Sequence, residues 1–482
     1  IITTIYCAII TIAAMAQTET PDSIEGKELN EVVVEAQMQR TNAEVSTYIP
    51  VARQKNASQN AVQLLSMMSI PQISVDPVSQ AVQTAHGENV SIFIDYLPAT
   101  SEDLKGMKTQ DVKKVEYYMH PSDARFQGAK YVINFVMQKY EWGGYTKLNA
   151  NKWFGVNRTE GSVYSKISYK KMIFDIYADE IYLTNRHTGQ SSVERFNFTD
   201  LYGKGPQSIT RTSETKSSLY RNNSNNISFR ALYNTDNIQI SNRIAYSLTN
   251  IPHNDVNNGL AYSTDLFPVS ESFTEASSRD WALNYSGEYF FMLSKQAALN
   301  IDANYTYGRN KSDSHYTVPD ELSIVNNAKE DVHRFDVYLH LNWNPNKANQ
   351  FFTNFGVIHG WNIINYYGNS PSRQKYDVGV YFLGQNYQHV FSEKWNVGAS
   401  LAWVWETNEI SGINADNNFP QTNINATWSP NDKNQIYLTA NYGMTVPSAS
   451  QKSPNMLQQD ELIWYRGTPQ LKDPTYTNGL LS

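Results

Sequence analysis

Alternation of apolar and polar side chains dominates this chain from about Tyr145 onward, in segments of about ten residues. In the segment 334–343 the two faces differ completely, with Phe335, Val337, Leu339, Leu341 and Trp343 on one side and Arg334, Asp336, His340 and Asn342 on the other. Successive side chains of a strand point to opposite faces. A tilted strand of this length crosses the hydrocarbon layer of a bilayer. The pattern therefore predicts a transmembrane antiparallel β-barrel, with lipid outside and water inside.

Composition is consistent with such a barrel and excludes a helical membrane protein. Mean hydropathy is −0.52, and no stretch after the N-terminus approaches the roughly 20 apolar residues that a spanning helix needs. Aromatic residues make up 13% of the chain, an excess that suits the girdles at the two membrane interfaces. Soluble β-proteins also favour aromatics in strands. The net charge of −7 gives no reason to expect nucleic-acid binding.

Residues 1–16 have the features of a signal peptide. An apolar core precedes Ala14-Met15-Ala16, which is a typical cleavage sequence. The alternative is a buried core strand. Cys7 is the only cysteine and lies in this segment, so we expect a mature chain without disulfides or cysteine metal sites. The chain lacks an initiator Met, so we expect the N-terminus to be incomplete. Export combined with a barrel points to the outer membrane of a diderm bacterium.

The remaining chain divides into three parts. Residues 17–39 are polar and expected to be disordered, apart from a short β-branched run. Residues 40–140 mix a helical pattern at 60–68 with strand patterns, which predicts a compact α/β domain. Within it, Thr100 or Ser101 caps a short helix that has Glu102 and Asp103 in its first turn. Residues 145–482 form the expected barrel.

The barrel region contains thirteen candidate strands: 145–153, 162–169, 172–183, 225–234, 237–248, 281–293, 296–307, 332–343, 351–358, 375–388, 395–405, 421–428 and 434–443. Short connections alternate with long ones at 184–224, 249–280, 308–331, 359–374 and 406–420. Outer-membrane barrels have short periplasmic turns and long extracellular loops, which sets the orientation. Bacterial single-chain barrels have even strand numbers, so we expect a C-terminally incomplete barrel, of about 22 strands in the full-length protein.

Several motifs, in this order, resemble the TonB-dependent receptors, and most closely the outer-membrane β-barrel receptors of Bacteroidetes. The stretches concerned are 29–36 (LNEVVVEA), 90–98 (VSIFIDYLP), 112–126 (VKKVEYYMHPSDARF), 131–135 (YVINF), 446–448 (VPS) and 467–472 (GTPQLK). Tyr96 and Tyr131 stand where the family commonly has Gly, and Thr468 replaces Asn. These departures put the tight backbone turns there in doubt.

The resemblance implies a plug domain at 40–140 inside the barrel and energised uptake of an extracellular ligand. Glu31, Val32, Val33, Val34 and Glu35 would form the box that pairs with a TonB-type periplasmic protein by strand addition. The alternative is that Val32–Val34 is simply the first plug strand. Further implied partners are outer-membrane lipid, a small or oligomeric ligand, and a surface lipoprotein.

Charged residues of the strands are expected on the inner face of the barrel, as solvated or plug-packing groups rather than ligand-binding ones. They are Arg230, Arg243, Arg334, Asp336 and His340. Aromatic stretches such as 361–367 and Trp464-Tyr465 could stack on a ligand or belong to a girdle or loop core. The chain has no catalytic motif, so we expect no catalytic residue, no metal site and no cofactor. Ligand-binding residues are left unassigned.

Two other functions remain open at this stage. A surface-exposed adhesion or binding protein would use the barrel only as an anchor for long loops. A passive porin is the third possibility, but it has no need of a folded N-terminal domain. Energy-dependent uptake distinguishes the receptor from both.

Overall fold

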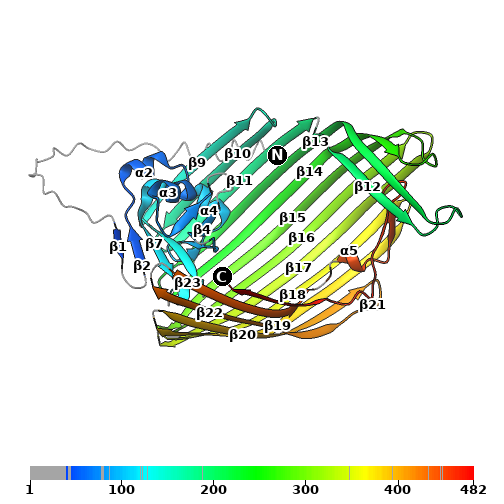
Figure 1. Ribbon diagram of the computed structural model, residues 1–482. Helices are drawn as coiled ribbons and strands as arrows, with labels where there is room; N and C mark the ends of the chain where they lie inside the picture. The colour runs from blue at the N-terminus through cyan, green and yellow to red at the C-terminus, as the bar shows by residue number, and fades with distance from the viewer. Residues whose placement is uncertain are drawn as a thin grey trace, which may run out of the picture.

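The computed structural model describes residues 39–481 except 42–44, 77–80, 86, 120, 122, 127–128, 187, 347, 393, 432–433, 446 and 448. The expected signal peptide (1–16) and the box residues Glu31, Val32, Val33, Val34 and Glu35 lie outside the described residues. Within the described part, no helix is long and apolar enough to span a membrane. The chain forms a small α/β domain and a large curved antiparallel sheet (Figure 1).

The α/β domain, called the plug domain below, extends from Gln39 to Met137. Its sheet has the order β1-β2-β7-β8-β5-β6, formed by β1 (Gln39–Thr41), β2 (Val45–Tyr48), β5 (Ser91–Ile94), β6 (Leu97–Pro98), β7 (Val112–Met119) and β8 (Tyr131–Met137). A hairpin and five short helical segments complete it: β3 (Ile73–Val75), β4 (Val82–Thr84), α2 (Ala52–Ala57), α3 (Ala61–Met68), α4 (Ser101–Gly106), η1 (Thr109–Asp111) and η2 (Ala124–Phe126).

The plug domain has its own hydrophobic core. The predicted helix at 60–68 is confirmed as α3, and Asn60 caps it by accepting a hydrogen bond from the Gln63 amide at 2.9 Å. The buried face of α3 packs against the sheet through a cluster that includes Ala61, Leu64, Leu65, Val115, Ile133 and Phe135. Because this core is internal, the domain does not depend on the large sheet for its apolar burial.

The large sheet, called the barrel wall below, has the main-path order β9-β10-β11-β13-β14-β15-β16-β17-β18-β19-β20-β22-β23-β26. Its strands are β9 (Trp142–Trp153), β10 (Arg158–Tyr169), β11 (Met172–Arg186), β13 (Gln207–Asn234), β14 (Ile238–Tyr262), β15 (Ser270–Ser294), β16 (Ala297–Val318), β17 (Leu322–Asn346), β18 (Asn349–Gly368), β19 (Ser372–Ser392), β20 (Trp395–Ile410), β22 (Asn417–Asn431), β23 (Asn434–Met444) and β26 (Thr475–Leu481). Off this path, β12 (Ser191–Phe198) pairs with β13 and β21 (Ile413–Asn414) pairs with β20.

Every predicted strand has a counterpart in the barrel wall, but the predicted long loops were largely wrong. The strands β13 to β17 continue far into the segments expected to be loops, and β14 and β15 leave only residues 263–269 between them. These extensions are mostly polar, because beyond the hydrocarbon layer no face of the strand has to be continuously apolar. The alternation that revealed the strands therefore stops before the strands do.

Two rows of aromatic side chains border an apolar band on the outer face of the wall. The upper girdle, at the long-extension end, consists of Trp281, Tyr307, His333 and Trp361, whose successive ring centroids are 4.8–5.3 Å apart. The lower girdle consists of Trp343, Phe351, Tyr387, Trp395 and Trp428.

The spacing of the two girdles matches a bilayer. On β17, His333 and Trp343 are ten positions apart, which is roughly 33 Å along a strand and roughly 25 Å across the bilayer for a tilt of about 40°. Between them, Phe335 and Leu341 are exposed, with about 40% of each residue's surface accessible. Exposed apolar side chains over such a band mark a contact surface, and their position between two aromatic girdles is typical of a surface that faces lipid.

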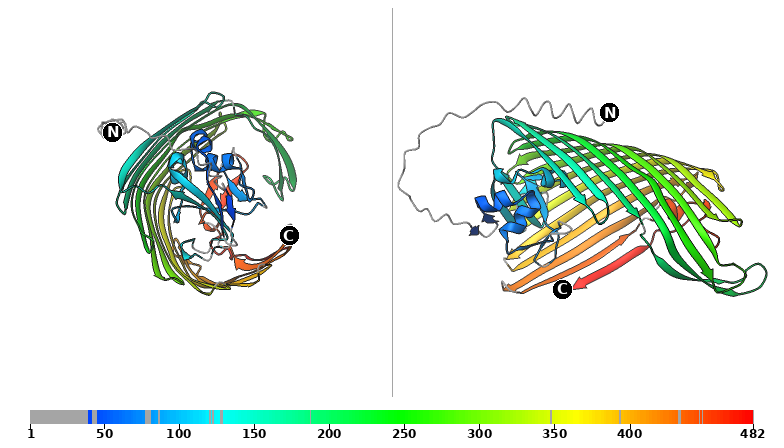
Figure 2. Two further views of the ribbon diagram at one scale, coloured as in Figure 1. Left: turned by 90° about the vertical axis from the view of Figure 1, so that its left-hand side faces the viewer. Right: turned by 90° about the horizontal axis from the view of Figure 1, so that it is seen from above.

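The plug domain lies within the curve of the barrel wall at the end where the connections are short (Figures 1 and 2). It contacts strands on several sides of the curve: Tyr145 on β9, Arg230 on β13, Arg243 on β14 and Tyr437 on β23. The edge strands of the sheet are β9 and β26. The inner face of the wall is thus identified independently by its contacts with the plug.

Candidate functional site

The helix α4 carries the carboxylates that join the plug to the wall. Thr100 caps the helix: its hydroxyl accepts from the Asp103 amide at 3.3 Å, and its own amide donates to the Asp103 carboxylate at 3.0 Å. The sequence prediction of this cap and of an acidic first turn is confirmed. The reciprocal cap fixes the Asp103 side chain, and Glu102 follows from the same first turn.

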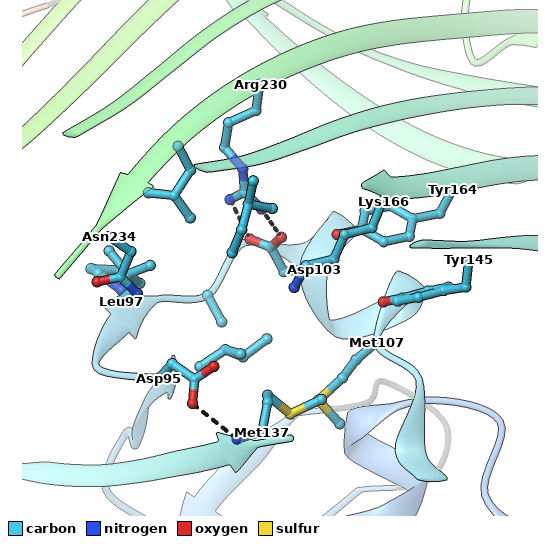
Figure 3. Close-up of a pocket in the computed structure, with 15 residues that line it drawn as sticks. Asp95, Leu97, Asp103, Met107, Met137, Tyr145, Tyr164, Lys166, Arg230 and Asn234 are labelled. Atoms are coloured by element: carbon cyan, nitrogen blue, oxygen red, sulfur yellow. Dashed lines mark hydrogen bonds and ion pairs between the residues drawn. The ribbon is translucent and has the colours of Figure 1, made fainter. Parts of the chain in front are cut away.

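Asp103 forms a two-pronged ion pair with the barrel wall (Figure 3). Arg230 on β13 donates through Nη1 at 2.9 Å and through Nη2 at 2.5 Å to the two carboxylate oxygens of Asp103. The same guanidinium donates through Nε and Nη2 to Asp175 on β11, at 3.0 and 2.8 Å. All three side chains are at least 88% buried. We call Asp103, Arg230 and Asp175 the plug latch.

A second ion pair lies beside the plug latch. Arg243 on β14 contacts the Glu102 carboxylate and donates to the Thr100 hydroxyl at 3.2 Å. Burial alone would raise the pKa of Asp103, but the Arg230 guanidinium and the cap hydrogen bonds hold it below its usual value. Burial also raises the pKa of Glu102, and there Arg243 compensates only in part. The attachment of α4 to the wall therefore depends on Asp103 more than on Glu102.

Close packing seals the remaining junction between α4 and the wall. Gly106 ends the helix, and a Cβ at this position would overlap the ring of Tyr164 on β10. Tyr145 on β9 donates to the Gly106 carbonyl at 3.2 Å. The cavity left between plug and wall has a volume of about 50 Å³, and Asp95 and Met137 are part of its lining (Figure 3). A space of this size holds no more than a few water molecules, so this junction fixes the plug to the wall and is too small for a ligand.

The turn around Tyr96 is tight despite the absence of glycine. Asp95 and Tyr96 link β5 to β6 with φ of 49° and 66°, both in the left-handed region where glycine is favoured. The doubt raised about this turn is therefore resolved: the geometry is retained. The side chain compensates for the unfavourable backbone, because the Arg125 guanidinium lies 3.6 Å from the Tyr96 ring centroid and the Phe126 ring packs beside it.

A second element folds onto the inner face of the wall at the opposite end. Residues 445–474, called the lumen segment below, connect β23 to β26 and contain α5 (Ala449–Lys452), β24 (Met456–Gln458) and β25 (Trp464–Arg466) (Figure 1). Lys452 and Asp473 form an ion pair within it at 3.1 Å, with both side chains at least 96% buried. The lumen segment is thus a folded structure of its own.

Glu461 fastens the lumen segment to three separate strands. It accepts from Arg211 on β13 at 2.6 Å, from the Tyr316 hydroxyl on β16 at 2.6 Å, and from the Tyr262 hydroxyl on β14 at 2.5 Å. Burial would raise the pKa of Glu461, but these donors lower it below its usual value. Two ion-paired elements, the plug domain and the lumen segment, therefore bound the interior of the wall at its two ends.

The expected inner-face charges are all on the inner face, but they do not form one site. Arg230 and Arg243 bind the plug, whereas Arg334 pairs with Asp336 at 3.0 Å and His340 lies 3.6 Å from Asp302. The open alternative for Trp361 is resolved in favour of the girdle. Trp464 and Tyr465 are exposed on β25 of the lumen segment. Among the described residues, no cluster of His, Cys, Asp and Glu has the geometry of a metal site.

Comparison with solved structures finds distant likenesses to outer-membrane receptors. The ferric yersiniabactin uptake receptor FyuA of Yersinia pestis is 10% identical, with 83% of this chain and 71% of that chain covered and a TM-score of 0.37. The Serratia marcescens hemophore receptor HasR, in complex with HasA and heme, is 10% identical, with 89% and 67% covered and a TM-score of 0.43.

The ferric-catecholate import receptor Fiu of Escherichia coli K12 is 8% identical, with 88% of this chain and 75% of that chain covered and a TM-score of 0.35. No protein-family model matches the chain, and no curated protein matches it. At these TM-scores the likenesses carry no weight for the ligand or the partner of this chain.

Proposed function

We propose that this protein is an outer-membrane receptor that takes up a scarce ligand by energised, TonB-dependent transport. The observation that carries the proposal is a separately folded domain held inside the barrel wall by buried ion pairs. The apolar outer band between two girdles supports the membrane location. Candidate ligands are siderophores or other metal chelates, cobalamin and oligomeric nutrients.

The chemistry of the junction favours a movable plug over a permanently packed one. The plug domain buries its own hydrophobic cluster, whereas ion pairs and hydrogen bonds such as Asp103–Arg230 hold it to the wall. When such polar contacts separate, water replaces the lost hydrogen bonds, so each contact contributes only a small net free energy to the attachment of the plug. A pulling force on the N-terminal segment would therefore separate the domain from the wall before it unfolds the domain.

The box residues Glu31 to Glu35 would transmit that force. An extended Val-rich segment can add as a strand to the sheet edge of a periplasmic partner, with affinity from main-chain hydrogen bonds. A ligand would enter the lumen at the end of the wall where the lumen segment lies and would meet the plug domain on the side that faces this end. A surface lipoprotein could assist capture at the same end.

Uptake measured with and without the proton gradient tests the proposal. The full-length gene is expressed in its own host, and radiolabelled metal chelates, cobalamin and peptides are supplied. We expect ligand-specific uptake that is lost when the gradient collapses, when 31–35 is deleted, and in Val33→Pro, which cannot donate a strand hydrogen bond at this position. Thr18→Pro, outside the box, is the matched control and keeps uptake.

Uptake that survives collapse of the gradient and deletion of the box would refute energised transport and would indicate a passive pore. Normal surface assembly without uptake, combined with tight binding of an extracellular macromolecule, would favour the second candidate. This is a barrel-anchored surface binding protein. The long polar extensions of β13 to β17 beyond the upper girdle are the observation in its favour.

A further inference from the structure

A row of cationic side chains crosses the outer face of β15, β16 and β17 just beyond the upper girdle. Arg279 is the cross-strand partner of Lys311, and Lys311 is the partner of Lys329. Arg309 lies opposite Trp281, two positions nearer the girdle than Lys311. All four cationic residues are exposed. We call them the cation row.

The register places the cation row on the lipid-facing side rather than in the lumen. Arg243, which contacts the plug, pairs with Ser286. Side chains alternate along a strand, so the odd-numbered residues of β15, including Trp281 and Arg279, face outward. Their partners on β16, Arg309 and Lys311, share that face. The row begins about 5–10 Å beyond the girdle, the depth at which lipid headgroups lie.

Two of the four cations in the row form ion pairs with carboxylates of the wall, and two do not. Like charges directly opposite each other destabilise a sheet. Arg309 pairs with Asp331 at 2.5 Å, and Lys311 pairs with Asp313 at 2.5 Å. Among the described residues, Arg279 and Lys329 have no ion pair; Lys329 lies 5.5 Å from the centroid of a tyrosine ring. Among the four cations of the row, Arg279 and Lys329 are therefore left without a carboxylate at ion-pair distance in the described part of the chain.

A hollow on the same face adjoins the cation row on the side away from the bilayer. It has a volume of about 420 Å³, and its polar lining includes His253, Asp255, Glu275, Asp313 and His315. Glu275 is the cross-strand partner of His315, and Asp313 also contacts the cation row. Imidazoles and carboxylates at this density offer donors and acceptors to the hydroxyl groups of a sugar.

We propose that the cation row and the adjoining hollow bind the phosphorylated saccharide headgroup of an outer-leaflet glycolipid. Arg279, Lys311 and Lys329 hold the phosphate, because charge-assisted hydrogen bonds to phosphate are the interactions that such exposed cations form best. The hollow takes the adjacent sugar, and the upper girdle contacts the acyl chains below. This inference rests on the proposed outer-membrane location but not on energised transport.

Lipid binding by the purified full-length protein tests the inference. Delipidated protein in detergent is given a lipid A-type glycolipid in bisphosphorylated or dephosphorylated form, and bound lipid is counted by native mass spectrometry. Each cation at a membrane surface contributes roughly a fivefold gain in affinity. The variant R279Q/K311Q/K329Q should therefore lose binding of the phosphorylated form by on the order of 100-fold.

A matched control removes the same charge elsewhere on the protein. Lys171, Lys295 and Lys394 are exposed at the short turns, so K171Q/K295Q/K394Q should bind as the unmodified protein does. Lys329→Arg should also retain binding, and a heat-dependent shift in gel mobility checks that each variant is folded. Binding of phosphorylated and dephosphorylated glycolipid with equal affinity would overturn the inference. So would an equal loss in the control triple, which would show general charge attraction only.

Failure of this inference and failure of the proposed function are separable. A protein that binds glycolipid as described but takes up no ligand would refute energised transport alone. A protein with normal gradient-dependent uptake and no phosphate-dependent lipid binding would refute the cation-row site alone.

Discussion

Replacement of Arg230 by Met should release the plug from the wall. The substitution preserves much of the side-chain volume but leaves Asp103 and Asp175 buried without their shared cation. Removal of one partner of a buried ion pair costs about 3–5 kcal/mol. Protonation of the stranded carboxyl limits that cost: for an Asp with the usual value of 3.8, protonation at pH 7 costs about 4.4 kcal/mol.

Counted for the Asp103 carboxyl alone, the expected loss of plug attachment is therefore about 3–4 kcal/mol at pH 7. If the plug amides exchange through separation from the wall, the exchange of α4 should accelerate by roughly 150- to 1,000-fold. Hydrogen exchange followed by mass spectrometry on the full-length protein measures this directly. Conductance of the protein in a planar bilayer should rise in parallel, since a displaced plug opens the lumen.

Arg334→Met is the control, because Arg334 is half exposed and forms its ion pair with Asp336 on the same strand rather than with the plug. It should leave α4 exchange and conductance unchanged. An Arg230→Met protein whose α4 exchange changes less than tenfold would refute the reasoning, since the latch would then contribute no more than a surface ion pair.

Three further predictions concern the plug, the lumen segment and the outer band. Asp103→Asn should accelerate α4 exchange at pH 7, whereas Glu102→Gln should not. The pKa of Asp103 is lower in the folded protein than the usual 3.8, so its ionised carboxylate stabilises the folded state above that pH, and this contribution is lost as the pH falls through the folded pKa. The pKa of Glu102 is raised, so ionisation of Glu102 does not stabilise the folded state in this way. Glu461→Gln should make the lumen segment susceptible to added protease at pH 7, and acidification below about 4.5 should do the same to the unmodified protein; continued resistance in both cases would contradict the assigned contacts. Leu339→Arg, at mid-band on the outer face, should cost about 2–4 kcal/mol in urea unfolding from lipid vesicles, while His340→Arg, which faces the lumen, should cost less than about 1 kcal/mol; equal costs would mean that the two faces are assigned wrongly.

The sequence predicted the parts of this fold that contact lipid, for a physical reason. Between the girdles, the hydrocarbon layer forces one face of every strand to be apolar, so the part of β17 that crosses this layer was found as the predicted strand 332–343. Beyond the girdles this requirement ends. Residues 322–331 of β17 therefore read as loop although they are strand.

The contacts that join distant segments could be predicted only in part. Arg230 and Arg243 were expected on the inner face from alternation alone, but alternation does not say which plug residue each one meets. The partnership of Glu461 with Arg211 was missed, because the two are 250 positions apart and each lies in a polar stretch. A polar residue that folds back into a lumen leaves no periodic signal in its own segment.

The extension of β13 to β17 beyond the upper girdle has a consequence for what can approach this protein. On β17, His333 lies eleven positions from Leu322 at the strand end, so the wall rises roughly 25–30 Å above the hydrocarbon boundary. A solute that enters the lumen from this end must therefore pass along this height of wall before it reaches the level of the bilayer. The wall also presents its hairpin tips, for instance residues 263–269, as the part of the protein that the cell's surroundings meet first.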